Sequence, residues 1–195
     1  MKKFETKQFN IPTLIGISEK TIEEHLKLYA GYVKHTNLIL EHIEELKQNT
    51  EKYAYELGEV QRRFGFEYNG MRNHEVYFAG FEGGPKSLNE ESELKKKIAE
   101  DFGSFEQWLT YFKTLATTRG VGWAMLYYDK KDKRLLNAWV DEQHLGQLQD
   151  CTLILGLDMW EHSYVADYQP SGKKNYIEDF FTNLNWGMIE KNFLI

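Results

Sequence analysis

The sequence contains few of the residues that cross-link or interrupt a chain. It has one cysteine, Cys151, and three prolines among 195 residues. A single cysteine excludes an internal disulfide. Cys151 leads into an apolar run with no base in a nearby motif, which favours a small core residue over a nucleophile. With so few prolines and no low-complexity tract, we expect order through nearly the whole chain.

Further absences limit the class of function. No apolar run approaches the length of a membrane-spanning helix, and residues 1–5 lead into no signal segment, so we expect a cytoplasmic protein without a membrane partner. No block of Lys and Arg is present and the net charge is −6, so no nucleic-acid partner is indicated. The chain also lacks a Gly-rich phosphate loop, a Gly-x-Ser-x-Gly elbow and a Cys-x-x-Cys pair.

Aromatic residues, in contrast, are abundant, with 5 Trp, 12 Tyr and 12 Phe. Together with the other apolar residues they suffice for one large core or two small units that pack together. Residues 80–85 contain three glycines and a proline, which predicts a hinge. We therefore expect an N-terminal helical hairpin domain over residues 1–82 and a C-terminal α+β domain over residues 83–195.

Hydrophobic periodicity predicts the elements of both parts. The first part has helical spacing over residues 19–49 and 51–64, and Asn69-Gly70 then predicts a turn before a new helix. The second part has three apolar runs with strand character, which predict a three-stranded antiparallel sheet. The expected elements of this part are helices over 90–101 and 104–117, strands over 120–128, 134–140 and 152–157, a helical segment to about 168 and a last helix over 173–193.

The run over residues 152–157 ends at an acid, Asp158, and an imidazole, His162, follows four residues later. If the chain turns into a helix there, both side chains face the same point. Oxygen and nitrogen donors of this kind bind first-row metals. The alternative interpretation is an acid that caps the next helix and a hydrogen-bonded core histidine.

Two further histidines complete a ligand set. His25 lies on or next to the apolar stripe of the first helix, and His74 lies in an aromatic segment. Each alone fits a core histidine. With Asp158 and His162 they offer three imidazoles and one carboxylate, which suits iron or manganese, or zinc in a tetrahedral site. Because the four residues come from both parts of the chain, we expect the metal between the two domains.

These motifs resemble those of the iron/manganese superoxide dismutases. The carriers of the resemblance are Asp-x-Trp-Glu-His at residues 158–162, Asn73-His74 before aromatic residues, and His25 in a long first helix. The resemblance runs through nearly the whole chain in order. It implies an enzyme that converts superoxide to dioxygen and hydrogen peroxide, with one Mn or Fe ion per subunit held by the three histidines and Asp158.

The resemblance also implies roles for residues near the metal. Tyr32 would be the gateway tyrosine at the open coordination position, although it follows His25 by seven residues where the family usually has eight. Gln143 would be the amide that hydrogen-bonds the metal-bound solvent, with His144 as the neighbouring alternative. Position 70, where some iron enzymes of the family carry that glutamine, is Gly70 here, which favours manganese over iron.

Further residues would surround the site and join subunits. The resemblance makes Lys173 the basic residue that guides substrate. Glu161 would reach the partner subunit's His162, which implies a homodimer or a tetramer. The aromatic residues expected to wall the site are Trp123, Trp160 and Phe78.

Two alternatives stay open from the sequence. One is a dismutase-like structural or interaction protein with a metal site but little activity, because a fold alone does not establish a function. The other is a different metalloenzyme, such as a zinc hydrolase, which would need a general base that Gln143 or Tyr32 would supply poorly.

Overall fold

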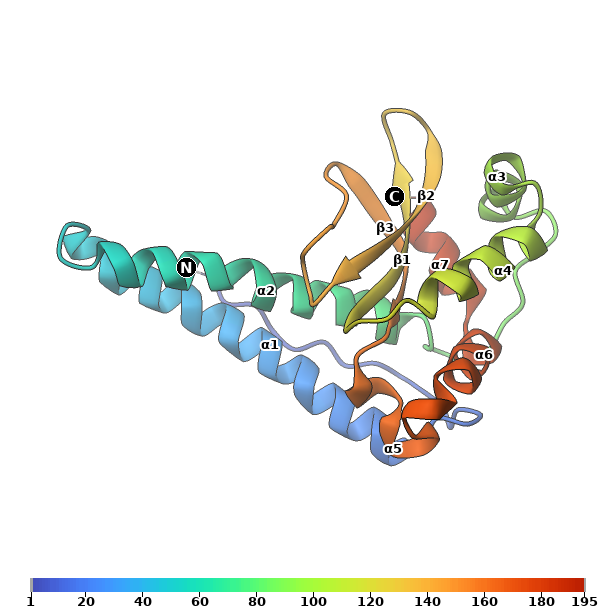
Figure 1. Cartoon of the computed structure of the whole chain (residues 1–195), viewed down its shortest axis with the longest axis horizontal. Coiled ribbons are helices and arrows are strands. Elements are labelled where there is room, and N and C mark those ends of the chain that lie inside the picture. The colour runs from blue at the N-terminus through green and yellow to red at the C-terminus, as the bar shows by residue number, and fades with distance from the viewer. Residues whose placement is uncertain (1, 195) are drawn as a thin grey trace.

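The computed structural model describes residues 2–194 and consists of a long helical arm and an α+β body (Figure 1). Two helices form the arm: α1 (Glu19–Leu46), which ends in the short 3₁₀ helix η1 (Lys47–Asn49), and α2 (Ala54–Ala79). Ser18 caps α1, since its side chain accepts a hydrogen bond from the backbone N–H of Thr21. The predicted helical hairpin is confirmed. Residues 2–14 contain no helix or strand and run along the hairpin.

The predicted turn at Asn69-Gly70 is wrong, because α2 continues through both residues. Asn69 stays helical and its side chain donates to the carbonyl of Gly65, 2.8 Å away. Gly70 is required for space, since a Cβ added there would lie 2.5 Å from Cδ1 of Tyr32. The glycine therefore marks a close approach of α1 to α2 and not a break in the chain.

The body contains the predicted three-stranded antiparallel sheet, in the order β2-β1-β3. Its strands are β1 (Gly122–Asp129), β2 (Arg134–Asp141) and β3 (Cys151–Asp158). Two helices precede the sheet, α3 (Glu93–Phe102) and α4 (Phe105–Ala116), and both begin at a serine cap. The α+β fold class is therefore confirmed.

The end of the chain is more broken than expected. After β3 come η2 (Glu161–Ser163), α5 (Val165–Tyr168), η3 (Pro170–Gly172), α6 (Lys173–Asn183) and α7 (Trp186–Phe193). The single helix expected over 173–193 is wrong, because Leu184 is extended and the side chain of Asn185 caps α7. The backbone N–H of Asn185 donates to the carbonyl of Gly80, 2.7 Å away. The break thus fastens the C-terminal helices to the end of α2.

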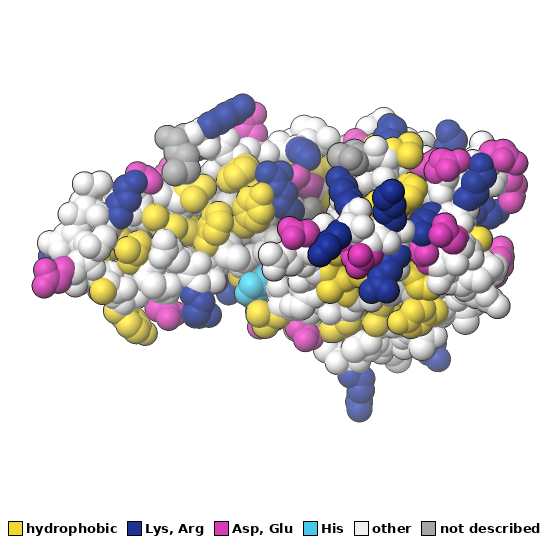
Figure 2. All heavy atoms as spheres, turned by 90° about the horizontal axis from the view of Figure 1, so that it is seen from above, with side chains coloured by type: hydrophobic (Ala, Val, Ile, Leu, Met, Phe, Trp, Pro, Cys, Tyr) yellow, Lys and Arg dark blue, Asp and Glu magenta, His cyan; other side chains and the backbone are white. Residues whose placement is uncertain are grey.

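One hydrophobic core joins the arm to the body. It extends from Leu14 and Ile17 in the N-terminal segment through the sheet to Ile189 in α7. Hydrophobic side chains also reach the surface along the arm (Figure 2). Whether the parts before and after residue 82 fold as separate domains stays a prediction. Over residues 2–194, no helix has the length and apolar character that crossing a membrane requires.

Candidate metal centre

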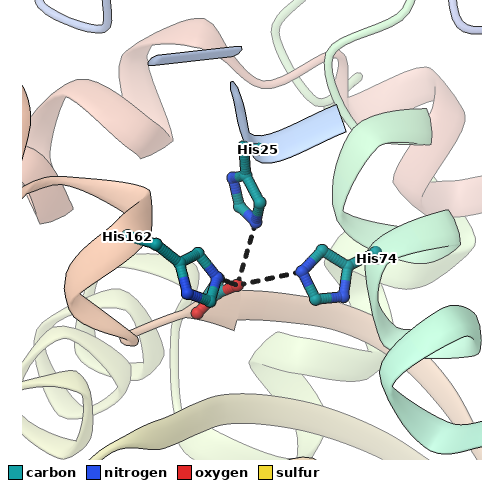
Figure 3. Close-up of side chains that lie close together, drawn as sticks. His25, His74 and His162 are labelled. Atoms are coloured by element: carbon teal, nitrogen blue, oxygen red, sulfur yellow. Dashed lines mark hydrogen bonds and ion pairs between the residues drawn. The ribbon is translucent and has the colours of Figure 1, made fainter. Parts of the chain in front are cut away.

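The four predicted ligands meet where the arm joins the body. His25 comes from α1, His74 from α2, Asp158 from the end of β3 and His162 from η2. Figure 3 shows the three imidazoles directed at one carboxylate oxygen. The Nε2 atoms of His25, His162 and His74 lie 3.1, 3.2 and 3.5 Å from Oδ2 of Asp158. One donor atom from each of the four residues lies within 4.8 Å of all the others.

The hydrogen bonds of His74 prepare it to bind a metal. Its Nδ1 lies 2.6 Å from the carbonyl oxygen of Gly70, so Nδ1 carries the proton and donates it. The lone pair of Nε2 therefore points into the cluster. Over residues 2–194 this buried Nε2 has no hydrogen-bond partner. A metal ion at this point would satisfy it, as a backbone-oriented histidine ligand requires.

Burial sets the charges that metal binding needs. His25, His74 and Asp158 are at most 1% exposed. Burial lowers the pKa of His25, and it lowers the pKa of His74 to about 3, so both imidazoles are neutral. Burial opposes ionisation of Asp158, but the interactions with His162 and His25 together outweigh it and hold the pKa of this carboxyl below its ordinary value. Three imidazoles, those of His25 and His74 neutral, and one carboxylate fit a divalent or trivalent iron or manganese ion.

The chain around Asp158 fixes the direction of its carboxylate. The residue pairs with Trp123 in the sheet, and its Oδ1 accepts a hydrogen bond of 2.8 Å from the backbone N–H of Trp160. Its carbonyl accepts from the hydroxyls of Ser163 and Tyr176 at 3.0 and 2.9 Å. The chain turns next into η2, and this 3₁₀ turn brings His162 back to the carboxylate, as the spacing predicts.

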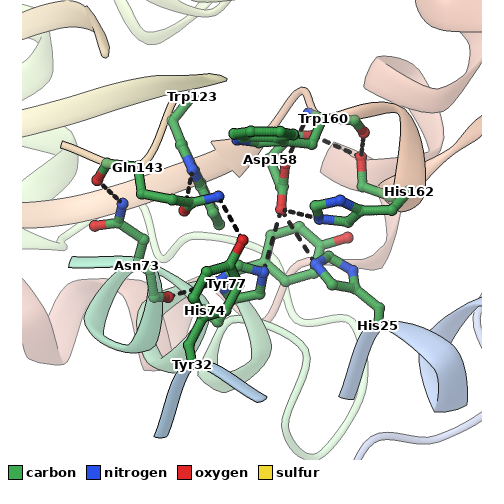
Figure 4. Close-up of polar contacts among 12 residues, drawn as sticks. His25, Tyr32, Asn73, His74, Tyr77, Trp123, Gln143, Asp158, Trp160 and His162 are labelled. Carbon is green, nitrogen blue, oxygen red and sulfur yellow. Dashed lines mark hydrogen bonds and ion pairs between the residues drawn. The ribbon is translucent and has the colours of Figure 1, made fainter. Parts of the chain in front are cut away.

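A second group of predicted residues lies beside the ligands. Nε1 of Trp123 donates to Oε1 of Gln143 at 3.0 Å, and Nε2 of Gln143 donates to the hydroxyl of Tyr32 at 3.0 Å (Figure 4). Asn73, next to the predicted ligand His74, donates to the carbonyl of Gln143 at 2.9 Å. The Gln143 side chain is fully buried. This hydrogen-bonded row connects the sheet to α1.

The structure distinguishes Gln143 from its neighbour. The ring of His144 packs edge-on against Phe66, with 5.8 Å between centroids, and lies close to Gly65 on α2. Gln143 is thus the member of the pair that contacts Tyr32. Its role toward metal-bound solvent stays a prediction.

The spacing of seven residues between His25 and Tyr32 places both on the same side of α1. Seven residues advance an α-helix by about 700°, which is about 20° short of two full turns. The helix is regular over Glu19–Leu46, without a bulge. The Tyr32 ring consequently lies beside His74, with 5.0 Å between centroids.

The three aromatic residues expected to wall the site lie against the candidate ligands. Phe78 packs against His25 at 4.9 Å, Trp123 against His74 at 5.1 Å, and Trp160 stacks on His162 at 5.8 Å between centroids. The His162 side chain keeps 23% of its surface exposed. The ligand cluster is therefore closed on the side of the core and accessible near His162.

Two predicted residues lie further out. Glu161 is exposed at the start of η2. Lys173 begins α6, and its Nζ donates to the carbonyl of Thr118 at 2.8 Å and lies 5.7 Å from the ring centroid of Trp139. Burial lowers the pKa of Lys173. These contacts join Lys173 to the β1 and β2 side of the body, and its role in guiding substrate stays a prediction.

The structure adds residues that sequence reasoning did not assign to the site. The hydroxyl of Tyr77 lies 3.1 Å from that of Tyr176, which in turn donates to the carbonyl of Asp158. Phe66 contacts both Tyr32 and Trp160. Tyr77 follows His74 by three residues on α2, so helical spacing was an available signal for it. Phe66 gave no comparable signal.

Comparison with known proteins agrees with this geometry. The family model for iron/manganese superoxide dismutases, C-terminal domain, matches residues 90–192. The iron superoxide dismutase of Cupriavidus metallidurans is 38% identical over 176 residues, which cover 89% of this chain and 86% of that protein. The manganese superoxide dismutase 2 of Haloferax volcanii is 34% identical over 173 residues, covering 87% and 83%. With ligands, surrounding residues and relatives in agreement, this chain belongs to the iron/manganese superoxide dismutase family.

Proposed function

We propose that this protein disproportionates superoxide, taking two superoxide anions and two protons to one dioxygen and one hydrogen peroxide. The observation that carries the proposal is the convergence of three imidazoles and one carboxylate beside a buried Gln143–Tyr32 hydrogen bond. An iron or manganese ion bound there supplies the one-electron oxidation and reduction that the reaction needs. The described ligands fit one such ion per chain.

The residues beside the ligands control orientation and protons. An indole N–H can only donate, so Trp123 fixes Oε1 of Gln143 and turns Nε2 towards Tyr32. The Tyr32 oxygen accepts this bond, which leaves its own O–H free to donate. Burial raises the pKa of the Tyr32 phenol, so the hydroxyl keeps its proton at neutral pH. We assign Tyr32 as a proton donor to the reduced substrate.

We propose manganese as the preferred metal. This proposal is supported by the position of the glutamine amide, which comes from residue 143 and not from residue 70. Gln143 supplies the amide from the segment between β2 and β3, while Gly70 leaves room for the Tyr32 ring, which a larger side chain would displace. Relatives of both metal types match the chain, so metal content after purification without added metal is the direct test.

We propose that two chains assemble across the surface that carries Glu161 and His162. Glu161 is exposed and His162 partly exposed, so a partner can reach both. Exposed apolar side chains on the arm, including Leu28 and Tyr55 at 43% and 78%, offer a second surface for a tetramer. Sedimentation velocity of wild type and Glu161→Ala tests this: the variant is expected to shift towards monomer. A cytoplasmic location stays a prediction.

The decisive experiment measures superoxide consumption per bound metal ion. A rate constant near the diffusional range of about 10⁸–10⁹ M⁻¹s⁻¹ is expected. A negligible rate from protein with a full metal site would contradict the proposal and favour a dismutase-like structural protein. The convergence of all four ligands speaks against that second candidate.

A further inference from the structure

An arginine and a buried glutamate lie one helical turn apart on α2. Nε and one terminal nitrogen of Arg63 each lie 2.8 Å from Oε1 of Glu67. The Glu67 side chain is 6% exposed and that of Arg63 is 52% exposed. A carboxylate this buried needs a partner, and Arg63 supplies it while keeping part of its guanidinium at the surface.

Arg63 covers the aromatic rim of the metal centre. Its guanidinium carbon lies 3.7 Å from the ring centroid of Phe66. Phe66 in turn contacts Tyr32 and Trp160, with centroid separations of 6.0 and 6.4 Å. One aromatic ring therefore separates the arginine from two side chains that border the ligands.

The charges of Arg63 and Glu67 act on the hydroxyl of Tyr32 beside the metal centre. Burial raises the pKa of Tyr32 most, and the charge of Asp158 comes second; the charge of Glu67 raises this pKa further, and that of Arg63 lowers it. The two side chains thus act on the same hydroxyl with opposite sign.

Two other cations differ from Arg63 in their surroundings. Arg62 pairs with Glu59 on the outer face of α2, where its side chain is 73% exposed. Lys173 is bound to the carbonyl of Thr118 on the body. Arg63 is therefore the cation that the described contacts join to the Phe66 rim.

We propose that Arg63 attracts superoxide to the Tyr32 side of the metal centre and that Glu67 limits this attraction. The inference rests on the proposed dismutase function. The chain carries a net charge of −6, so an anionic substrate gains from a local cation at the entrance. Low-dielectric aromatic walls concentrate the field of such a cation. Glu67 holds the guanidinium over Phe66 and cancels part of its charge.

The test uses substitutions that change the charge in opposite directions. Arg63→Gln is expected to lower kcat/KM about fivefold at low ionic strength, with the loss shrinking as salt is added. Arg63→Lys keeps the charge and is expected to restore most of the rate. Glu67→Gln is expected to raise kcat/KM about twofold. A purely structural role for the pair would lower the rate in both Gln variants.

Arg62→Gln is the matched control, since it removes the same charge from the adjacent residue. It is expected to leave kcat/KM within the error of wild type. Metal content and melting temperature of every variant separate electrostatic effects from misfolding. The dissociation constant of azide, a small monovalent anion, is measured by absorption titration of the metal-loaded proteins. It is expected to rise in Arg63→Gln and to fall in Glu67→Gln.

The outcomes separate this inference from the proposed function. If Arg63→Gln and Arg62→Gln share the same salt dependence and the same azide affinity, Arg63 does not attract anions and the inference is overturned. If wild type with a full metal site consumes no superoxide, the proposed function fails. The azide titration then still decides whether Arg63 draws an anion to the site.

Discussion

The inner and outer parts of the metal centre are built in different ways. The inner part consists of four side chains, three of them fully buried, whose donor atoms face one point. The outer part, with Tyr32 and Phe66, is half-buried and is held by ring contacts and single hydrogen bonds. Under the proposed function, metal binding and substrate access would therefore use separate residues. Substitutions should therefore affect one without the other.

The largest effect is expected from removing an inner ligand. His74→Ala deletes a nitrogen donor from a site without solvent access at that residue. Metal affinity is expected to fall by more than about 100-fold, since residues outside the ligand shell alone are worth about 10–100-fold. Superoxide consumption should fall to background. Metal analysis and the activity assay measure both.

His35→Ala is the control for this prediction. His35 lies on the exposed face of α1, away from its buried stripe. Both metal content and activity are expected to match wild type. Retention of the metal by His74→Ala would show that His74 is not a ligand.

A smaller effect is expected in the outer part. Tyr32→Phe keeps the ring against His74 and removes the hydroxyl that Gln143 contacts. Turnover is expected to fall by at least about tenfold, because a positioned proton donor is worth about 10²–10⁴-fold. Metal content should stay unchanged. A fall in metal content parallel to the fall in turnover would erase the distinction between inner and outer parts.

The smallest effect is expected from a substitution at Gly70, the position on α2 against which the Tyr32 ring packs. Gly70→Ala places a Cβ about 2.5 Å from the Tyr32 ring, so the ring must move. The free energy of unfolding is expected to fall by about 1–2 kcal/mol, as for other overpacked sites, even though alanine favours a helix. Chemical denaturation measures this change.

Gly58→Ala on the same helix provides the matched control. A Cβ there meets nothing within 4 Å. The substitution is expected to raise the free energy of unfolding by about 0.5–1 kcal/mol. If Gly70→Ala and Gly58→Ala change the free energy of unfolding equally, the close contact between Gly70 and Tyr32 does not affect stability.

Local sequence patterns predicted more of the site than long-range contacts did. Asp158 and His162 were predicted because a strand end and a short turn bring residues four apart to one point. Two predictions about helix breaks were wrong. A break was expected at residues 69–70, where α2 is continuous, and none was expected at residues 184–185, where α6 and α7 are separate. Asn-Gly favours a turn in isolation, but α2 continues through it, and the glycine serves the close approach of the Tyr32 ring. The last helical region breaks after Asn183, and Asn185 starts α7 where its backbone N–H donates to the carbonyl of Gly80.

The sequence by itself determined the helical hairpin, the three-stranded sheet and the choice of the four candidate ligand residues. Each depends on periodicity, or on residue types in motifs that resemble a known family. Only the tertiary structure decided that Gln143 contacts Tyr32, that seven residues suffice between His25 and Tyr32, and that Arg63 covers Phe66. These contacts join side chains from different elements or depend on how a helix packs. Their distances follow from the folded core, which no local pattern encodes.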